Sequence, residues 1–172
     1  MALLHEVDKT GLSIPLAMSF SLKGVYYTPM FADPSAPKTD EFQLFKPCTR
    51  HREPFYEDPK VLCTQSGWIS NGSLPLLAYN MGEKKTITYL TEATIAQLAC
   101  NAKQLNLNLK FSLVAYDVDF DQAPPCHRLG FAPAGGPFTR INNMREVMNF
   151  ILTSYTSAKE NFNCQLVAIS IG

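Results

Sequence analysis

Two stretches of the chain have an apolar side chain at every second position, which is the pattern of a β-strand with one buried face. In residues 16–23 every second residue is apolar, from Leu16 to Leu22. In residues 105–116 the same holds from Leu105 to Ala115. Helical geometry would scatter these side chains around its surface, so both stretches require a sheet. Gly24, directly after the first, is a plausible place for a β-bulge.

Two further segments have apolar residues at helical spacing. One covers residues 92–105, with Thr91 as its N-cap, and the other carries an apolar stripe from Met144 to Tyr155. Residues 164–172, CQLVAISIG, predict a closing strand. The sequence therefore predicts an α+β fold, with a mostly antiparallel β-sheet packed against two α-helices and long Pro-rich loops. At 172 residues and 46% hydrophobic content, we expect one globular domain spanning residues 1–172.

The Pro-rich regions, residues 28–60 and 122–138, are long for connections inside a small domain and contain many aromatic residues. Loops of this kind either pack on their own domain or dock on another molecule. We expect them to supply self-association contacts, and the candidate residues are Met30, Phe31, Phe131 and Phe138. The alternative is a pair of loops folded back over their own sheet.

Charge argues against a protein that binds phosphate over its whole surface, because fifteen basic residues balance fifteen acidic ones. An anionic partner would have to bind a local patch. The candidates for contact with an anionic membrane or a nucleocapsid are Lys46, Arg50, Arg52, Lys84 and Lys85. A solvated loop is the alternative, since acidic residues follow Arg52 directly.

Five widely spaced cysteines, without a C-x-x-C pair, predict reduced thiols in a cytosolic compartment. The first residues include acidic side chains and no long apolar run, so we expect no signal peptide. The Asn71-Gly72-Ser73 sequon is then expected to be a turn that is not glycosylated.

Asp117, Asp119 and Asp121 follow the second alternating stretch at every second position. This run opens like a calcium loop, but Gln122 stands where the loop needs glycine and Arg128 where it needs glutamate. No phosphate-binding loop accompanies it. We interpret the run as the exposed end of a strand that binds no metal. The alternative is a magnesium site formed by Asp117 and Asp119.

Cysteine and histidine also lie close in the sequence at Cys48 and His51 and at Cys126 and His127. They could hold zinc, although adjacent Cys-His is poor spacing for one tetrahedral ion. A small cytosolic hydrolase or transferase could use either pair with an aspartate from the 117–121 run. Because no catalytic sequence signature accompanies them, we expect a protein that is not an enzyme and has no cofactor.

The last part of the chain resembles the matrix proteins of rhabdoviruses of the vesicular stomatitis type. The matching residues are FSLVAYDVDFDQAPPCHRLGF and INNMREVMNFILTSYTSAKENFNCQLVAISIG, within residues 105–172. With only Lys9 basic in its first twenty residues, the chain is nearer to a short plant-infecting relative. The resemblance implies a structural protein that self-associates, binds the viral nucleocapsid and contacts the anionic inner leaflet during assembly and budding. Its location would be the virion, beneath the envelope, and the host cytoplasm.

Pro34, Ser35, Ala36 and Pro37 form a P-[ST]-A-P tetrapeptide like the late-domain motif by which matrix proteins recruit host endosomal-sorting proteins. Such a motif must be extended and exposed to bind. A viral module that targets a host protein is a further interpretation, and the sequence does not distinguish it from a matrix protein.

Overall fold

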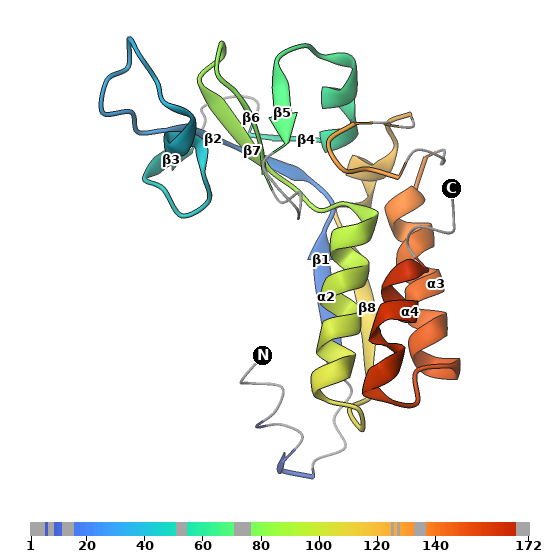
Figure 1. The fold of residues 1–172 in the computed structure, drawn as a ribbon. Helices are drawn as coiled ribbons and strands as arrows, with labels where there is room; N and C mark the ends of the chain where they lie inside the picture. The colour runs from blue at the N-terminus through green and yellow to red at the C-terminus, as the bar shows by residue number, and fades with distance from the viewer. Residues whose placement is uncertain are drawn as a thin grey trace.

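The computed structural model describes residues 6, 9–11, 16–50, 55–70, 77–124, 126, 128–132 and 137–167 (Figure 1). Its larger sheet is antiparallel, in the order β3-β2-β7-β6-β5 with β4 paired to β2. The strands are β2 (Gly24–Pro29), β3 (Cys48–Arg50), β4 (Tyr56–Glu57), β5 (Trp68–Ser70), β6 (Leu77–Asn80) and β7 (Lys85–Thr88). The predicted α+β class and the mostly antiparallel sheet are confirmed.

A second sheet pairs β1 (Leu16–Ser21) with β8 (Phe111–Tyr116) in parallel. It packs against α2 (Glu92–Leu105) and α3 (Thr139–Thr153), and the short α4 (Asn161–Leu166) packs on those helices (Figure 1). Four 3₁₀ helices occur in the described connections: η1 (Thr39–Phe42), η2 (Pro59–Thr64), η3 (Val118–Asp121) and η4 (Ala158–Glu160). No helix among the described residues is long and apolar enough to cross a membrane.

The first alternating stretch forms β1, and the chain enters the other sheet directly after it. β1 pairs with β8, whereas β2, which begins at Gly24, pairs with β7. A side chain at Gly24 would collide with the side chain of Ile87 and would lie 3.2 Å from the backbone oxygen of Glu57. Glycine is therefore needed where the chain leaves one sheet and enters the other.

The second alternating stretch becomes a strand later than its pattern predicts. Helix α2 continues through Leu105, and β8 begins only at Phe111. The helix end is fixed by side chains: the Asn106 amide donates to the Ala102 oxygen (3.2 Å), and the Lys103 ammonium donates to the Leu109 oxygen (3.1 Å). The N-cap prediction is confirmed, because the Thr91 hydroxyl accepts from the Thr94 backbone N–H.

The predicted closing strand is wrong over its first residues, since Cys164 to Leu166 belong to α4. Residues 168–172 lie outside the described structure. The strand pattern was overridden by a tertiary constraint, because Cys164 is fully buried and bonded to Cys100 of α2.

The prediction of reduced thiols is wrong as well. Two disulfides join cysteines that are 63 and 64 residues apart, Cys63 with Cys126 and Cys100 with Cys164. The Cα atoms within the pairs are 5.6 and 5.9 Å apart, well within bonding reach. Only Cys48 is a free thiol, and it is exposed.

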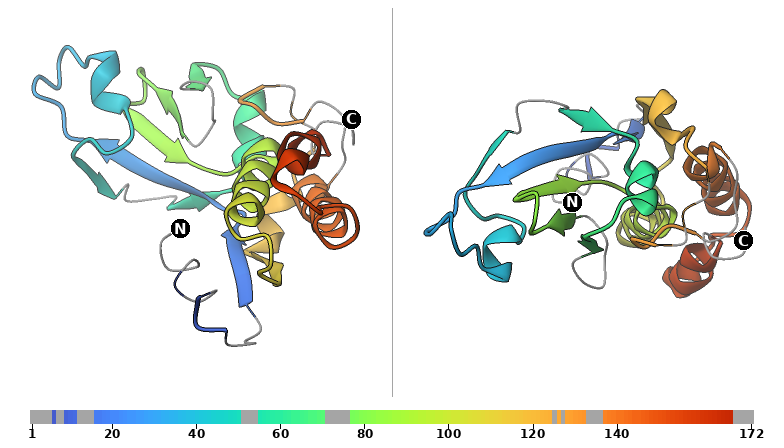
Figure 2. Two further views of the ribbon diagram at one scale, coloured as in Figure 1. Left: turned by 60° about the horizontal axis from the view of Figure 1, so that its bottom comes forward. Right: turned by 90° about the horizontal axis from the view of Figure 1, so that it is seen from above.

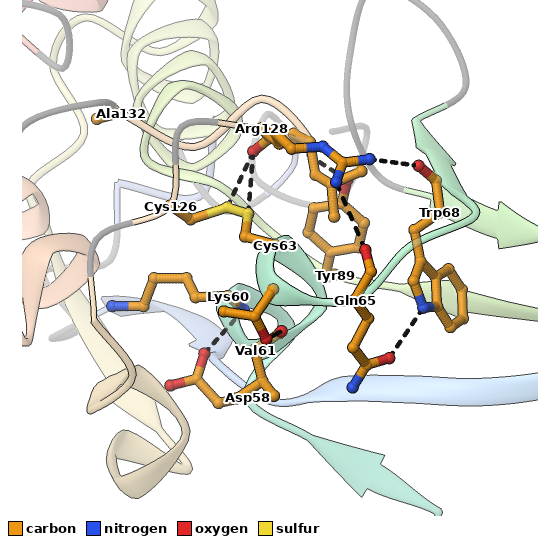
Figure 3. The surroundings of a disulfide bond; sticks show 12 residues. Asp58, Lys60, Val61, Cys63, Gln65, Trp68, Tyr89, Cys126, Arg128 and Ala132 are labelled. Atoms are coloured by element: carbon orange, nitrogen blue, oxygen red, sulfur yellow. Dashed lines mark hydrogen bonds between the residues drawn. A yellow bond between two sulfur atoms is a disulfide. The ribbon is translucent and has the colours of Figure 1, made fainter.

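The Cys63–Cys126 bond anchors the Pro-rich loop after η3 to η2, the 3₁₀ helix that precedes β5 of the larger sheet (Figure 3). Beside it, the guanidinium of Arg128 donates to the backbone oxygens of Trp68 (3.2 Å) and Gln65 (3.4 Å). This loop is therefore held to its own domain by covalent and polar contacts.

We expect one thiol per chain to react with Ellman's reagent in denaturant alone and five after reduction. Replacing Cys100 and Cys164 together by serine should lower the free energy of unfolding by about 2–5 kcal/mol, because the open chain gains entropy. Cys48→Ser is the matched control and should leave stability unchanged. Five reactive thiols before reduction would contradict both disulfides.

Candidate functional site

The carboxyl ends of the parallel strands β1 and β8 are where α/β proteins most often place their functional groups. The aspartate run lies at this end, but its three members do not share one face. β8 ends at Tyr116, Asp117 has a left-handed backbone (φ 55°), and the other two belong to η3. The predicted exposure is found at Asp119, although this residue lies in η3 and not on a strand. It is wrong for Asp121, which is fully buried.

Asp117 forms a half-exposed polar group with β1 and its continuation. Its carboxylate accepts from the Ser21 hydroxyl (2.6 Å) and lies 3.4 Å from the Lys23 ammonium. The same ammonium lies 4.2 Å above the ring of Tyr56. These contacts close the end of the β1–β8 pair, and each of the named groups has a structural partner.

Asp121 is the centre of a buried charge network. One carboxylate oxygen is 2.9 Å from both the Arg140 Nε and the Lys60 ammonium. The other accepts the backbone N–H groups of Arg140 (3.0 Å) and Ile141 (3.2 Å), so it caps the N-terminus of α3. A carboxylate with four donors on it stabilises the fold and has no free lone pair pointing to a substrate.

Arg140 extends this network to both sheets. Its guanidinium donates to the backbone oxygen of Leu22 (2.7 Å), between β1 and β2, and to that of Leu90 (3.1 Å), between β7 and α2. It also donates to the Phe120 oxygen and lies 3.7 Å from Asp58. Nothing in the sequence pattern distinguishes Arg140 from a surface arginine, so sequence reasoning missed it.

The metal and enzyme interpretations lose one of their candidate ligands, Cys126. Within the described ranges, no three histidine, cysteine, aspartate or glutamate side chains gather as a metal site would require. Cys126 is bonded to Cys63, so it offers no thiolate for zinc or for nucleophilic attack while that bond is intact. His51 and His127 lie outside the described residues, as does Asn71-Gly72-Ser73.

The late-domain-like tetrapeptide is exposed at Pro34, Ser35 and Ala36 but is not extended. It forms a turn in which the Ala36 N–H donates to the Asp33 backbone oxygen (3.1 Å). The Ser35 hydroxyl (2.7 Å) and its backbone N–H (2.9 Å) both donate to the Asp33 carboxylate, and together they hold the pKa of Asp33 below its usual value. The extended backbone expected of a late-domain motif is therefore not found here.

Two of the five residues of the predicted basic patch make intramolecular contacts. Lys84 donates to the backbone oxygen of Pro34, and Lys85 pairs with Glu83 and lies 5.2 Å from the ring of Tyr26. Lys46 is exposed. The side chain of Arg50 and all of Arg52 lie outside the described residues.

The predicted self-association residues fall into three groups. Phe131 is buried (6% exposed), and its ring stacks on that of Tyr89 with 5.4 Å between the ring centroids. The prediction that Phe131 is exposed for self-association is therefore wrong. Phe138 is 40% exposed, and Phe31 is half-buried against Phe42. Met30 is 61% exposed, as a contact residue should be.

The distal loop, which we define as residues 30–47 between β2 and β3, carries a further exposed residue. Phe45 has a left-handed backbone (φ 65°) and is as exposed as in an unfolded chain (102%). The loop lies at the end of the molecule farthest from the helices (Figure 2). A pocket of about 270 Å³ lies at its base, lined by Tyr27, Phe42, Leu44 and Phe45 among others.

A second apolar surface lies at the helical end, between β8 and α3. It contains an open groove of about 470 Å³, whose lining is mostly apolar: Leu113, Ala115, Ile141, Met144, Met148 and Leu152, together with the polar Arg145 and Asn149. Leu152 is 69% exposed. The sequence predicted the apolar stripe of α3 but gave no sign that part of it would lack a neighbour.

Comparison of the chain with protein-family models and with curated protein sequences found no match. The resemblance to rhabdovirus matrix proteins therefore stays a prediction from the sequence.

We expect Asp121→Asn to lower the free energy of unfolding by about 3–5 kcal/mol, because two buried cations lose their charged partner. The exposed Asp119→Asn, two residues away, should change it by less than about 0.5 kcal/mol. Urea unfolding of both variants measures the difference. Equal effects would mean that the network does not hold the fold together.

Burial raises the pKa of Tyr89 to about 12. In the unfolded chain this phenol ionises near pH 10, so its contribution to stability is complete below pH 10 and is lost as the pH rises to about 12. We expect Tyr89→Phe to weaken the fall in stability over this range. Tyr116→Phe, at a tyrosine that is 58% exposed, is the control and should leave the fall unchanged.

Proposed function

We propose that the protein is a non-enzymatic structural protein that assembles with other copies of itself. The observation that carries this proposal is the placement of apolar side chains at the two ends of the molecule, on the distal loop and in the β8–α3 groove. Two different apolar surfaces on one chain are what head-to-tail association requires.

The difference between the candidate catalytic or metal-binding residues and the exposed apolar residues supports the proposal. Three of the residues that sequence reasoning offered for chemistry are engaged in structure: Asp121 caps α3, Asp117 binds Ser21 and Lys23, and Cys126 is in a disulfide. The exposed residues Met30 and Phe45, by comparison, have no structural task that would explain their place in solvent.

Phe45 is the residue best placed to be an anchor. Burying one phenylalanine side chain in a partner contributes about 1.5–3 kcal/mol. A left-handed backbone is unfavourable for a residue with a Cβ atom, so its retention here suggests that the exposed ring has a use.

The resemblance gives this function a specific form, in which the assembled protein also contacts a nucleocapsid and an anionic membrane. Lys46 on the distal loop is the exposed basic residue that supports such a contact. The disulfides limit where this could happen, because such bonds persist in oxidising compartments and are rare in the cytosol. They therefore argue against the cytoplasmic location expected from the sequence, and with it against contact with a nucleocapsid and an inner leaflet that face the cytosol.

Sedimentation velocity over a range of concentrations tests the proposal. We expect concentration-dependent association, and we expect Phe45→Ser to weaken it roughly tenfold or more, since a buried aromatic contact is lost. Phe162→Ser is the matched control, because Phe162 is 70% exposed on α4 and far from the distal loop. The melting temperature should not change in either variant. A wild-type protein that stays monomeric at all concentrations would contradict the proposal.

A further inference from the structure

β8 has one edge that pairs with no described residue. The Leu22 N–H donates to the Tyr116 oxygen (3.1 Å), so the backbone groups of Tyr116 point toward β1 and its continuation. Successive residues in a strand direct these groups to opposite sides. Those of Phe111, Leu113 and Ala115 therefore point away from β1, toward the groove. They form a row of donors and acceptors of the kind that another strand can pair with.

The groove beside this edge lies beneath the overhanging part of α3. Met144, Val147 and Ile151 of α3 belong to the buried cores. Met144 also lines the groove, together with Met148 and Leu152, and Leu152 is mostly exposed. A parallel sheet normally has both faces and both neighbours covered, and a pair of strands alone is marginally stable. The space beside β8 could therefore hold one more strand, which would pair with the free edge of β8 and be covered by the apolar side chains of α3.

A single extended segment fits this space better than a whole β8–α2 unit of another molecule would. The layer above the missing strand is already occupied by α3. An incoming strand that brought its own covering helix would collide with α3. The occupant must therefore be a strand that arrives without a helix over it.

We propose that residues 168–172 of a second copy of this chain fill the groove as a third strand beside β8, an inference that rests on the proposed self-association. Their sequence, Ala-Ile-Ser-Ile-Gly, alternates apolar with small side chains. Ile169 and Ile171 would enter the groove beneath α3. Ala168 and Ser170 would then continue the outer face of the sheet, which is formed by small residues such as Ser19 and Ser112.

The position of α4 favours a second copy over the chain's own segment. α4 packs on α2 and α3, and Cys164 is bonded to Cys100. Figure 1 shows β8 behind this layer of helices. Five extended residues span at most roughly 17 Å, and a helix with its side chains is about 10 Å across. A path around α3 would use most of this span and would leave little of the segment to pair along β8 of the same molecule.

Cross-linking between two variants tests the inference directly. One protein carries Cys48→Ser and Met148→Cys, and the other carries Cys48→Ser and Ile169→Cys, so that each has one free thiol. Both new cysteines are central, one in the groove and one in the segment, and they meet whichever way the strand runs. Mild oxidation of the mixture should give a cross-linked dimer in at least tenfold excess over either protein alone.

Association measured by sedimentation provides the second arm. We expect Ile169→Asp to weaken self-association at least tenfold, whereas Ser170→Asp, on the outer side of the same segment, changes it less than twofold. If the wild type associates but neither the cross-link nor this contrast is found, the inference is overturned and the proposed function stands. If the wild type does not associate at all, both fail.

A third variant carries Met148→Cys and Ile169→Cys in one chain on the Cys48→Ser background. It shows whether the groove is filled by residues 168–172 of a second copy or by those of the same chain. A cross-linked dimer on a non-reducing gel supports the exchange between copies. A cross-linked monomer would mean that the chain fills its own groove, which overturns the second-copy assignment.

Discussion

The carboxylate of Asp121 is shared by the side chains of Lys60 and Arg140 and by the first backbone N–H groups of α3. Together with Asp58 they make two cations and two carboxylates, so the cluster is neutral although it is almost fully withdrawn from water. Burying charges is costly unless each is paired and hydrogen-bonded. The cluster satisfies this condition only when η2, η3 and the start of α3 are all in place, which makes their positions mutually dependent.

The network also explains how two small sheets form one fold. Arg140 donates to the backbone at Leu22 and at Leu90, which are the two points where the chain passes from one sheet region to the other. Close to the first of these, Gly24 allows the strand to approach Ile87 and enter the larger sheet. Neither sheet alone could supply these acceptors, so the arginine ties the orientation of one sheet to the other.

Local signals in the sequence were sufficient for the elements that local interactions determine. The Thr91 cap, the helix that follows it and the apolar stripe of α3 were all predictable, because each depends on residues within a few positions of one another. The disulfides were not predictable, since their partners are 63 and 64 residues apart and only the fold brings them together. The same holds for Asp121: an alternation that is real up to Tyr116 was extended over a left-handed residue that changes the direction of the chain.

Exposure within the Pro-rich loops was the other property that the sequence could not assign. Phe131 and Phe45 have similar surroundings in the sequence, yet one stacks on Tyr89 and the other projects into solvent. The two loops differ in how firmly they are bonded to the rest of the fold. The loop that contains Phe131 is held by the Cys63–Cys126 bond and by Arg128, so Phe131 packs into the core of the larger sheet. The distal loop has no disulfide. The nearest cysteine, Cys48 at the start of β3, is a free thiol. Aromatic side chains remain available for other molecules where the chain is least tied to its own core, which is why the fully exposed phenylalanine, Phe45, lies on the distal loop.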